Sequence, residues 1–245
     1  MLLFTACRRQ PAPTVFLDPA LAVLVPSDTK LLAGIRMQRL KATPLYESVI
    51  LKSPRRLEFR KVSGLADDSE VWEYLIAYNG SDWLALMRGK FAEMGMEPRV
   101  DKPAARRVSY NGVTIIGDDQ GAVAFLNPTT ALAGRYEVVL RALEQRNSNS
   151  GVPLALEKLA LKIPAVNDLW FVSVGPAPGF FPVEHLKTAT AGLNPKTREL
   201  NMRIEADSQD AAESIATAVN GRAEGDRVVI SGPATKGVLD WIFGG

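Results

Sequence analysis

The chain is poor in the side chains from which redox and metal sites are usually built, because it has one cysteine, Cys7, and one histidine, His185. A single cysteine cannot close an internal disulfide, so an exported chain of this kind would be held together by its core alone. Zinc sites need several thiolates or imidazoles, which this sequence does not offer, and only an all-oxygen calcium or magnesium site remains available. We therefore expect no cofactor and no zinc or copper site.

Long apolar runs and phosphate-binding loops are missing as well. No segment approaches the ~20 apolar residues that a membrane-spanning helix needs. Neither G-x-G-x-x-G nor G-x-x-x-x-G-K-[ST] occurs, which argues against a nucleotide cofactor. The basic pairs Arg55-Arg56 and Arg106-Arg107 lack the interleaved aromatic residues of single-strand binders. We therefore expect no nucleic-acid partner.

What is present is ordinary globular material, with 245 residues, 47% hydrophobic content and 23% charged residues. The net charge of +2 is unevenly spread, because residues 1–63 hold eleven Lys or Arg against four acidic residues. That excess beside a lipid anchor would favour anionic headgroups, at about 1 kcal/mol for each well-placed charge. A solvated helix face explains the same charges, and we prefer that interpretation.

The first residues carry the most informative pattern, a short apolar run that ends in Thr5-Ala6-Cys7 and then turns polar. A lipoprotein signal ends in a cysteine that receives the lipid. Six residues precede Cys7 and none is basic, so either the true start lies upstream or the match arises by chance. We predict lipid attachment at Cys7, with residues 1–15 as signal remnant and tether. The protein is then expected at the periplasmic side of the bacterial cell envelope, anchored to a membrane.

The next part of the chain, residues 16–147, reads as an N-terminal α+β unit. Residues 30–36 form a predicted buried strand, Thr43 is a predicted helix cap before Pro44, and a basic helix is predicted from Pro54 to Val62. From residue 70 the apolar pattern alternates, and Asn111-Gly112 is a strong hairpin turn. These signals predict an antiparallel meander of about six strands, followed by a helix that begins near residue 136.

A smaller C-terminal α+β unit is predicted for residues 148–245, after a polar boundary. It contains strands at 169–174, 199–206 and 227–231, and a final helix at 238–243. Asp207 or Ser208 is the predicted cap of the helix between the last two strands. The overall class is α+β with a mainly antiparallel sheet, and an internal duplication into two related ferredoxin-like units is an open alternative.

Several short motifs resemble those of a known family. They are Val25-Pro26-Ser27-Asp28-Thr29, Leu32-Ala33-Gly34, Thr43-Pro44-Leu45-Tyr46, Arg88-Gly89-Lys90-Phe91, Tyr110-Asn111-Gly112 and Ala122-Val123-Ala124-Phe125. Over about residues 20 to 175 the chain is similar to a family of uncharacterised bacterial predicted lipoproteins. The resemblance implies export and an α+β body, and it assigns no catalytic residue.

Candidates for chemistry are few. An unperturbed histidine side chain has a pKa near ~6.5, which suits a general base, so His185 is one candidate, and the pairs Asp67-Asp68 and Asp118-Asp119 could supply carboxylates. Adjacent acids on a turn usually point into water, and Ser173 lacks the first glycine of a nucleophile elbow. We treat His185, Asp118 and Asp119 as weak catalytic candidates.

An aromatic stripe adds a last candidate. Trp72, Tyr74 and Tyr78 share one strand face by period two, which favours a core face over an exposed binding platform. With no nucleophile, metal or cofactor constellation, the sequence favours a non-catalytic envelope lipoprotein that binds a protein partner or supports an assembly. The alternative is an envelope hydrolase that uses carboxylates and the single histidine. No residue pattern specifies a small-molecule ligand.

Overall fold

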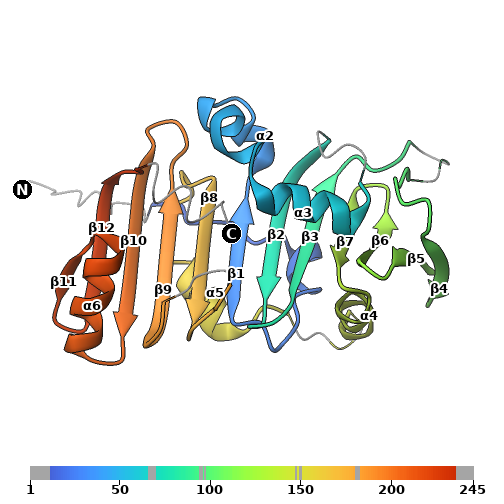
Figure 1. Cartoon of the computed structure of the whole chain (residues 1–245). Helices are drawn as coiled ribbons and strands as arrows, with labels where there is room; N and C mark the ends of the chain where they lie inside the picture. The colour runs from blue at the N-terminus through green and yellow to red at the C-terminus, as the bar shows by residue number, and fades with distance from the viewer. Residues whose placement is uncertain are drawn as a thin grey trace, which may run out of the picture.

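The computed structural model describes residues 12–65, 70–93, 96, 98–146, 148, 151–179 and 183–235. In that part of the chain all strands belong to one antiparallel sheet, in the order β11-β12-β10-β9-β8-β1-β2-β3-β7-β6-β5-β4 (Figure 1). The strands are β1 (Leu31–Ile35), β2 (Val71–Tyr78), β3 (Trp83–Gly89), β4 (Arg106–Tyr110), β5 (Val113–Asp118), β6 (Gly121–Asn127), β7 (Thr130–Gly134), β8 (Leu169–Val174), β9 (Leu186–Leu193), β10 (Glu199–Ala206), β11 (Arg222–Glu224) and β12 (Arg227–Pro233). The predicted α+β class with an antiparallel sheet is confirmed.

Short helices cover parts of the sheet. They are α1 (Pro19–Ala22), α2 (Met37–Leu40), α3 (Pro54–Ser63), α4 (Tyr136–Gln145), α5 (Leu154–Ala160) and α6 (Gln209–Val219), with η1 (Tyr46–Ile50) as a turn of π-helix. Among the described residues, no helix combines the length and the apolar character needed to cross a bilayer.

Strand β1 lies in the middle of the sheet. It pairs with β2 on one side, where Gly34 faces Leu75, and with β8 on the other, where Gly34 faces Trp170. Strands from both sides of the boundary predicted at residue 147 therefore form a single sheet. A Cβ atom on Gly34 would lie 2.2 Å from the Trp170 indole, so only glycine fits at this junction.

The six strands predicted after residue 70 are all present, but their order differs from a simple meander. Strand β3 pairs with β7, whereas β4 lies at the far edge of the sheet. The long connection between β3 and β4 carries the chain to that edge, and β4 to β7 then return as hairpins. The predicted turn at Asn111-Gly112 is confirmed, because both residues have positive φ, 48° and 78°.

The register places two rows of apolar side chains on opposite faces. On one face, here called the front face, Leu200, Leu193, Leu169, Ile35, Tyr74, Met87 and Ala131 lie in register across seven strands. On the back face α4 and α5 pack on the sheet, with Val139 and Leu156 buried in a core that also includes Trp170. Strands β6 and β7, which contact both α3 and α4, are thus largely buried on both faces.

The front face is covered by helices at two separate places. Helices α2 and α3 pack on the N-terminal strands, and α6 packs on β10 to β12 (Figure 1). Ser53 precedes Pro54 at the start of α3, and Gly64 ends the helix at φ 65°. At α6 the Ser208 hydroxyl accepts the Ala211 N–H at 3.1 Å, which confirms the cap predicted at this position.

The structure differs from the sequence predictions at three places, and a fourth prediction concerns residues that the structure does not describe. Strand β9 was not predicted, because its Thr and Ala residues give a weak alternating signal. A register shift at the start of β2 leaves Trp72 38% exposed, while Tyr74 and Tyr78 are buried, so Trp72 is not part of the core face. Thr43 donates to the Leu40 carbonyl and does not cap a helix. The helix predicted at 238–243 lies outside the described residues.

Candidate functional site

His185 lies just before β9 and is largely exposed, at 69% of its side chain. Its Nδ1 is 3.8 Å from an Asp207 carboxylate oxygen, and its carbonyl accepts the Asp207 N–H at 2.9 Å. The residue adopts a positive φ of 58°, as expected in a turn that tolerates polar side chains. Because the two residues are also joined by this backbone hydrogen bond, the contact between their side chains follows from the turn that precedes β9.

Asp118 ends β5 and forms an ion pair with Lys102, whose side chain is only 3% exposed. It also accepts backbone N–H groups of Gln120 and Gly121, at 2.9 Å and 3.2 Å. Burial alone would raise the pKa of the Asp118 carboxyl, but these hydrogen bonds outweigh it and hold that pKa below the ordinary 3.8. Asp118 therefore clamps the β5–β6 turn, and the adjacent Asp119 is exposed in the same turn.

The structure does not bring the two candidates together. His185 precedes β9 and Asp118 ends β5, and seven inter-strand steps separate these strands in the sheet. At about 4.8 Å for each step, the separation is on the order of 33 Å. His185 and Asp118 therefore do not form one acid–base pair. Cys7, Asp67 and Asp68 lie outside the described residues.

Ser173 occupies the core strand position expected for it. The residue is fully buried in β8, and its hydroxyl lies 2.9 Å from the Gly175 carbonyl and 3.3 Å from the Lys30 carbonyl. The first contact ties the end of β8 to the turn that follows it, and the second ties β8 to the residue that precedes β1. In the described part of the chain, no group of three or more His, Cys, Asp or Glu side chains is placed to hold a metal ion.

Among the described residues, an apolar pocket of about 190 Å³ lies on the front face. It opens in the interval between the helices that cover the two ends of that face, above β1, β8 and β9. The floor is a row of side chains in register: Ala191, Phe171, Ala33, Ile76 and Ala85. Three of these five are alanines, so the row leaves space that larger side chains would fill.

The next row of the floor is bulkier. Leu200, Leu193, Leu169, Ile35 and Tyr74 lie in register beside the alanine row and also line the pocket. All of these side chains are apolar or aromatic. The lower surface of the pocket therefore offers no carboxylate, imidazole or thiol for chemistry.

Helix α3 and the chain before it form the wall and the roof. Phe59 packs edge-on against Tyr74, with ring centroids 5.4 Å apart, and also contacts Trp83. Arg55 reaches from α3 to the Gly179 carbonyl at 3.2 Å, and thereby joins the roof to the β8–β9 connection. Tyr78 donates to the Pro178 carbonyl in the same connection. The pocket walls are thus held together by segments that lie at least 100 residues apart in sequence.

Charged groups are confined to the helix side of the pocket, at Arg55, Arg56 and Glu58. Burial lowers the pKa of the Arg55 guanidinium from its ordinary value, and the Glu58 carboxylate partly offsets that shift. An arginine nevertheless stays charged at neutral pH. The site thus combines an apolar interior with a mixed, predominantly basic rim, which suits an apolar or amphiphilic ligand.

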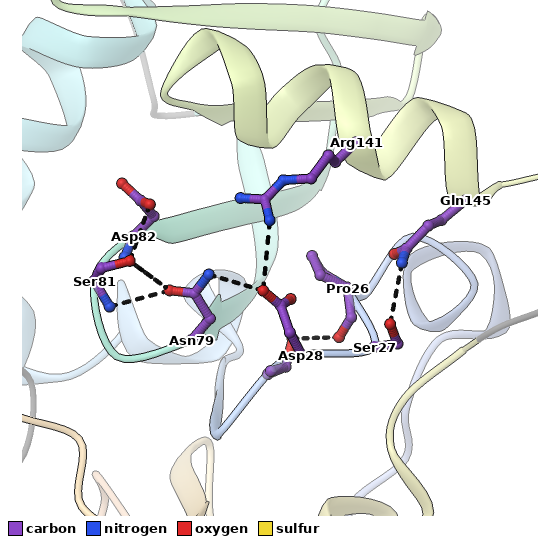
Figure 2. Close-up of polar contacts among 9 residues, drawn as sticks. Pro26, Ser27, Asp28, Asn79, Ser81, Asp82, Arg141 and Gln145 are labelled. Carbon is purple, nitrogen blue, oxygen red and sulfur yellow. Dashed lines mark hydrogen bonds and ion pairs between the residues drawn. The ribbon is translucent and has the colours of Figure 1, made fainter.

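One sequence motif has a structural role that can be followed in Figure 2. Asp28 accepts an amide N–H of Asn79 at 3.0 Å and lies 3.5 Å from the Arg141 guanidinium. Gln145 donates to Ser27 at 3.2 Å. The Ser27-Asp28 turn therefore joins the start of β1 to the β2–β3 turn and to α4. These contacts give the Val25–Thr29 motif a structural role in joining three parts of the fold, and they do not indicate a binding site there.

Sequence reasoning did not identify the pocket. Its signal in the sequence was the presence of small alanine side chains within apolar strands, such as Ala33, Ala85 and Ala191. That signal becomes meaningful only once the strand order shows that these positions are neighbours.

No protein-family model and no curated protein matches the chain. Solved structures with a similar fold include three crystal forms of a protein named TP0453. Form I has a TM-score of 0.54 and 11% identity over 91% of this chain and 95% of that chain. Form III has a TM-score of 0.55 and 12% identity, with 88% and 93% covered. Form IV has a TM-score of 0.52 and 11% identity, with 90% and 92% covered. At this identity the likeness establishes the fold alone.

Proposed function

We propose that this chain is a lipid-tethered protein of the bacterial cell envelope that binds an apolar or amphiphilic ligand without chemical turnover. The observation that carries the proposal is the front-face pocket, with its apolar floor and its charged groups confined to one side. Burial of a ligand chain there would be driven by the hydrophobic effect, at about 25 cal/mol for each Å² of apolar surface removed from water. A protein partner in the envelope would use the same pocket by inserting an apolar segment.

The location rests on the N-terminal pattern. The cysteine of the Thr5-Ala6-Cys7 sequence lies five residues before Ala12, where the described chain begins. Pro13 accepts the Ala165 N–H at 2.9 Å, so the tether would meet the body beside the segment that follows α5. The resemblance to bacterial predicted lipoproteins supports the same location, on the periplasmic side of a membrane.

The hydrolase alternative receives less support. His185 is exposed beside Asp207, and Asp118 serves the clamp with Lys102, some seven strands away. General acid–base catalysis requires groups within hydrogen-bond reach of one substrate. The binding role therefore accounts for more of the described structure than the hydrolase does.

The internal duplication is also retained as a proposal. Strands β5, β6 and β7 form three adjacent antiparallel strands followed by the helix α4, and β8, β9 and β10 are likewise followed by α6. Strand β8 leads into a Gly-Pro sequence at residues 175–176, and β12 ends on another at residues 232–233. A ferredoxin-like unit is supported most directly by the order β10, α6, β11, β12, because β12 lies between β10 and β11 in the sheet, as in a split β-α-β unit.

The proposal is tested by titration with N-phenyl-1-naphthylamine, a neutral apolar dye whose fluorescence rises in apolar sites. We expect the full chain to bind the dye, and Ala33→Phe to weaken binding at least tenfold, because the new ring would occupy the floor between Ile76 and Phe171. Ala155→Phe is the matched control, because Ala155 is exposed on α5, on the opposite side of the sheet. Equal binding by all three proteins would contradict the pocket as the site.

The tether is checked on the same protein expressed in a bacterium from its gene with the native upstream DNA. We expect a membrane-associated product whose intact mass shows a diacylglyceryl-sized increment on Cys7 and loss of residues 1–6. An unmodified chain that begins at Met1 would remove the envelope location and leave the pocket hypothesis to be judged by the dye.

A further inference from the structure

A group of exposed apolar side chains lies on the back face, around α5. Leu154 begins α5 and Leu161 follows its last residue, and because they are seven residues apart they lie on the same side of the helix. Phe16 precedes α1 and Val166 precedes β8. These four side chains, here called the α5 patch, are each between 54% and 63% exposed. Exposed apolar side chains that gather in this way mark a surface that contacts a protein or a membrane.

Backbone pairing brings the segment before α1 against the segment after α5. The Val15 N–H donates to the Ile163 carbonyl at 2.9 Å, and both of these side chains are buried. Side chains alternate between the two sides of an extended chain, so Phe16 and Val166 point outward, away from the buried pair. Since Leu161 lies two residues before Ile163, the outward side of this pairing adjoins the exposed side of α5. The four side chains therefore belong to one surface.

The proposed tether would reach the body at the same place. Pro13 accepts the Ala165 N–H at 2.9 Å, directly beside Val166. Cys7 lies five residues before Ala12, and five residues extend at most about 18 Å. A lipid on Cys7 would therefore keep the α5 patch close to the bilayer surface.

The charges on α5 complement an anionic surface. Lys158 and Lys162 are exposed on the helix and directly after it, and Glu157 is the one exposed acid of this helix. Lysine side chains can lie along apolar surface while their ammonium groups reach lipid headgroups. Basic residues near such a surface add to the attraction, and they act together with a lipid chain in stable anchoring.

Two arginines extend this basic surface beyond α5. Arg36 donates to the Ala165 carbonyl at 3.0 Å, next to Val166. Arg39 is exposed and lies 3.3 Å from Asp168, which is buried. The acidic partner of this group is therefore withdrawn from the surface, while the Arg39 side chain remains accessible.

We propose that the α5 patch docks on an anionic lipid bilayer, so that the tethered body sits on the membrane by its back face. Its geometry rests on the proposed lipid tether, which makes the second contact intramolecular and raises the effective concentration of the patch at the membrane. The front-face pocket lies on the opposite side of the sheet and therefore opens away from the lipid. A ligand then reaches the pocket from the periplasmic side rather than directly from the bilayer that holds the anchor.

The docking is tested on the full chain after its Cys7 thiol has been coupled to a maleimide lipid in vesicles of phosphatidylethanolamine and phosphatidylglycerol. This coupling supplies the tether whether or not a cell adds lipid to Cys7, so the result is independent of the intact-mass test of lipidation. We expect backbone amides of residues 13–17 and 154–167 to exchange with deuterium at least threefold more slowly than in the uncoupled chain.

The variant Phe16→Ser/Leu161→Ser/Val166→Ser should lose this protection, and it should keep its fold because all three side chains are exposed. Leu57→Ser is the matched control, because Leu57 is similarly exposed on α3, which covers the front face. We expect that control to retain the protection. Protection of α3 in place of residues 154–167, or equal exchange in the coupled and uncoupled chains, would overturn the proposal.

The choice of an anionic bilayer as the partner is tested by changing the lipid and the lysines. Coupling to phosphatidylcholine vesicles, or Lys158→Gln/Lys162→Gln on the anionic vesicles, should reduce the protection at least twofold. Protection that is unchanged in both experiments would overturn the anionic partner. Sedimentation velocity of the uncoupled chain under reducing conditions tests a second copy as the partner. We expect a monomer, and a dimer that the triple serine variant dissociates would assign the patch to self-association instead.

Discussion

Strand β7 and strand β10 show how differently the two halves of one sheet are packed. All five residues of β7 are buried, because α3 covers its front face and α4 covers its back face. In β10 buried Leu200, Met202 and Ile204 alternate with exposed Asn201 and Arg203, so only its front face is covered. The N-terminal half is thus a three-layer structure and the C-terminal half a two-layer structure. The pocket lies on the front face between α3, which covers the N-terminal half, and α6, which covers the C-terminal half.

The largest effect is expected at the junction of the two halves. Gly34→Ala places a Cβ atom 2.2 Å from the Trp170 ring, which sits in the back-face core and cannot move away freely. We expect a loss of about 4 kcal/mol in unfolding free energy, measured by urea denaturation. The double variant Gly34→Ala/Trp170→Leu should recover part of that loss; if it recovers nothing, the steric explanation fails.

A pair of leucine deletions compares the two kinds of packing directly. Leu86→Ala, in the back-face core of β3, should cost about 3 kcal/mol because its neighbours surround it completely. Leu193→Ala should cost about 1.5 kcal/mol, because one side of Leu193 already borders the pocket and fewer contacts are lost. Thermal or urea unfolding checks both values. Equal losses would show that the pocket is filled in solution to core density.

The smallest changes in stability are expected from two ion pairs, one in each half of the sheet. Asp118→Asn removes the partner of the buried Lys102, and we expect a loss of about 1.5 kcal/mol at pH 7, reduced from the fully buried case because Asp118 keeps 22% exposure. Glu205→Gln, in the exposed pair with Arg227, should change stability by less than about 0.5 kcal/mol.

The sign of the pH dependence follows from the lowered pKa of Asp118. The carboxylate binds fewer protons in the folded state than in the unfolded state, so its stabilisation is full above the ordinary 3.8 and is lost as the pH falls through the lower folded value. The difference between the wild type and Asp118→Asn should therefore shrink below about pH 4. A difference that stays constant down to pH 2 would be inconsistent with this ion pair.

Turns and single strands could be predicted from the sequence more completely than the pairing of strands that lie far apart in the chain. Asn111-Gly112 and the alternation in β10 were readable because turn conformation and strand alternation depend on residues close in sequence. Strand β9 was missed because Ala189 and Ala191 carry little hydrophobic signal. The pairing of β1 with β8, and hence the pocket floor, depends on contacts between residues 31–35 and 169–173, which no local pattern encodes.

The central place of β1 also bears on how the chain folds as it is made. Ile35 pairs with Leu169, 134 residues later, so β1 has only one of its neighbours until β8 has been synthesised. Pairing over such a separation is slow, because a long loop must close before the contact is formed. Until then the edge of β1 that β8 will cover exposes unpaired backbone groups in an apolar strand, the arrangement most prone to aggregation. A chain of this topology should therefore gain more than most from a chaperone that holds it open until residue 174 has emerged.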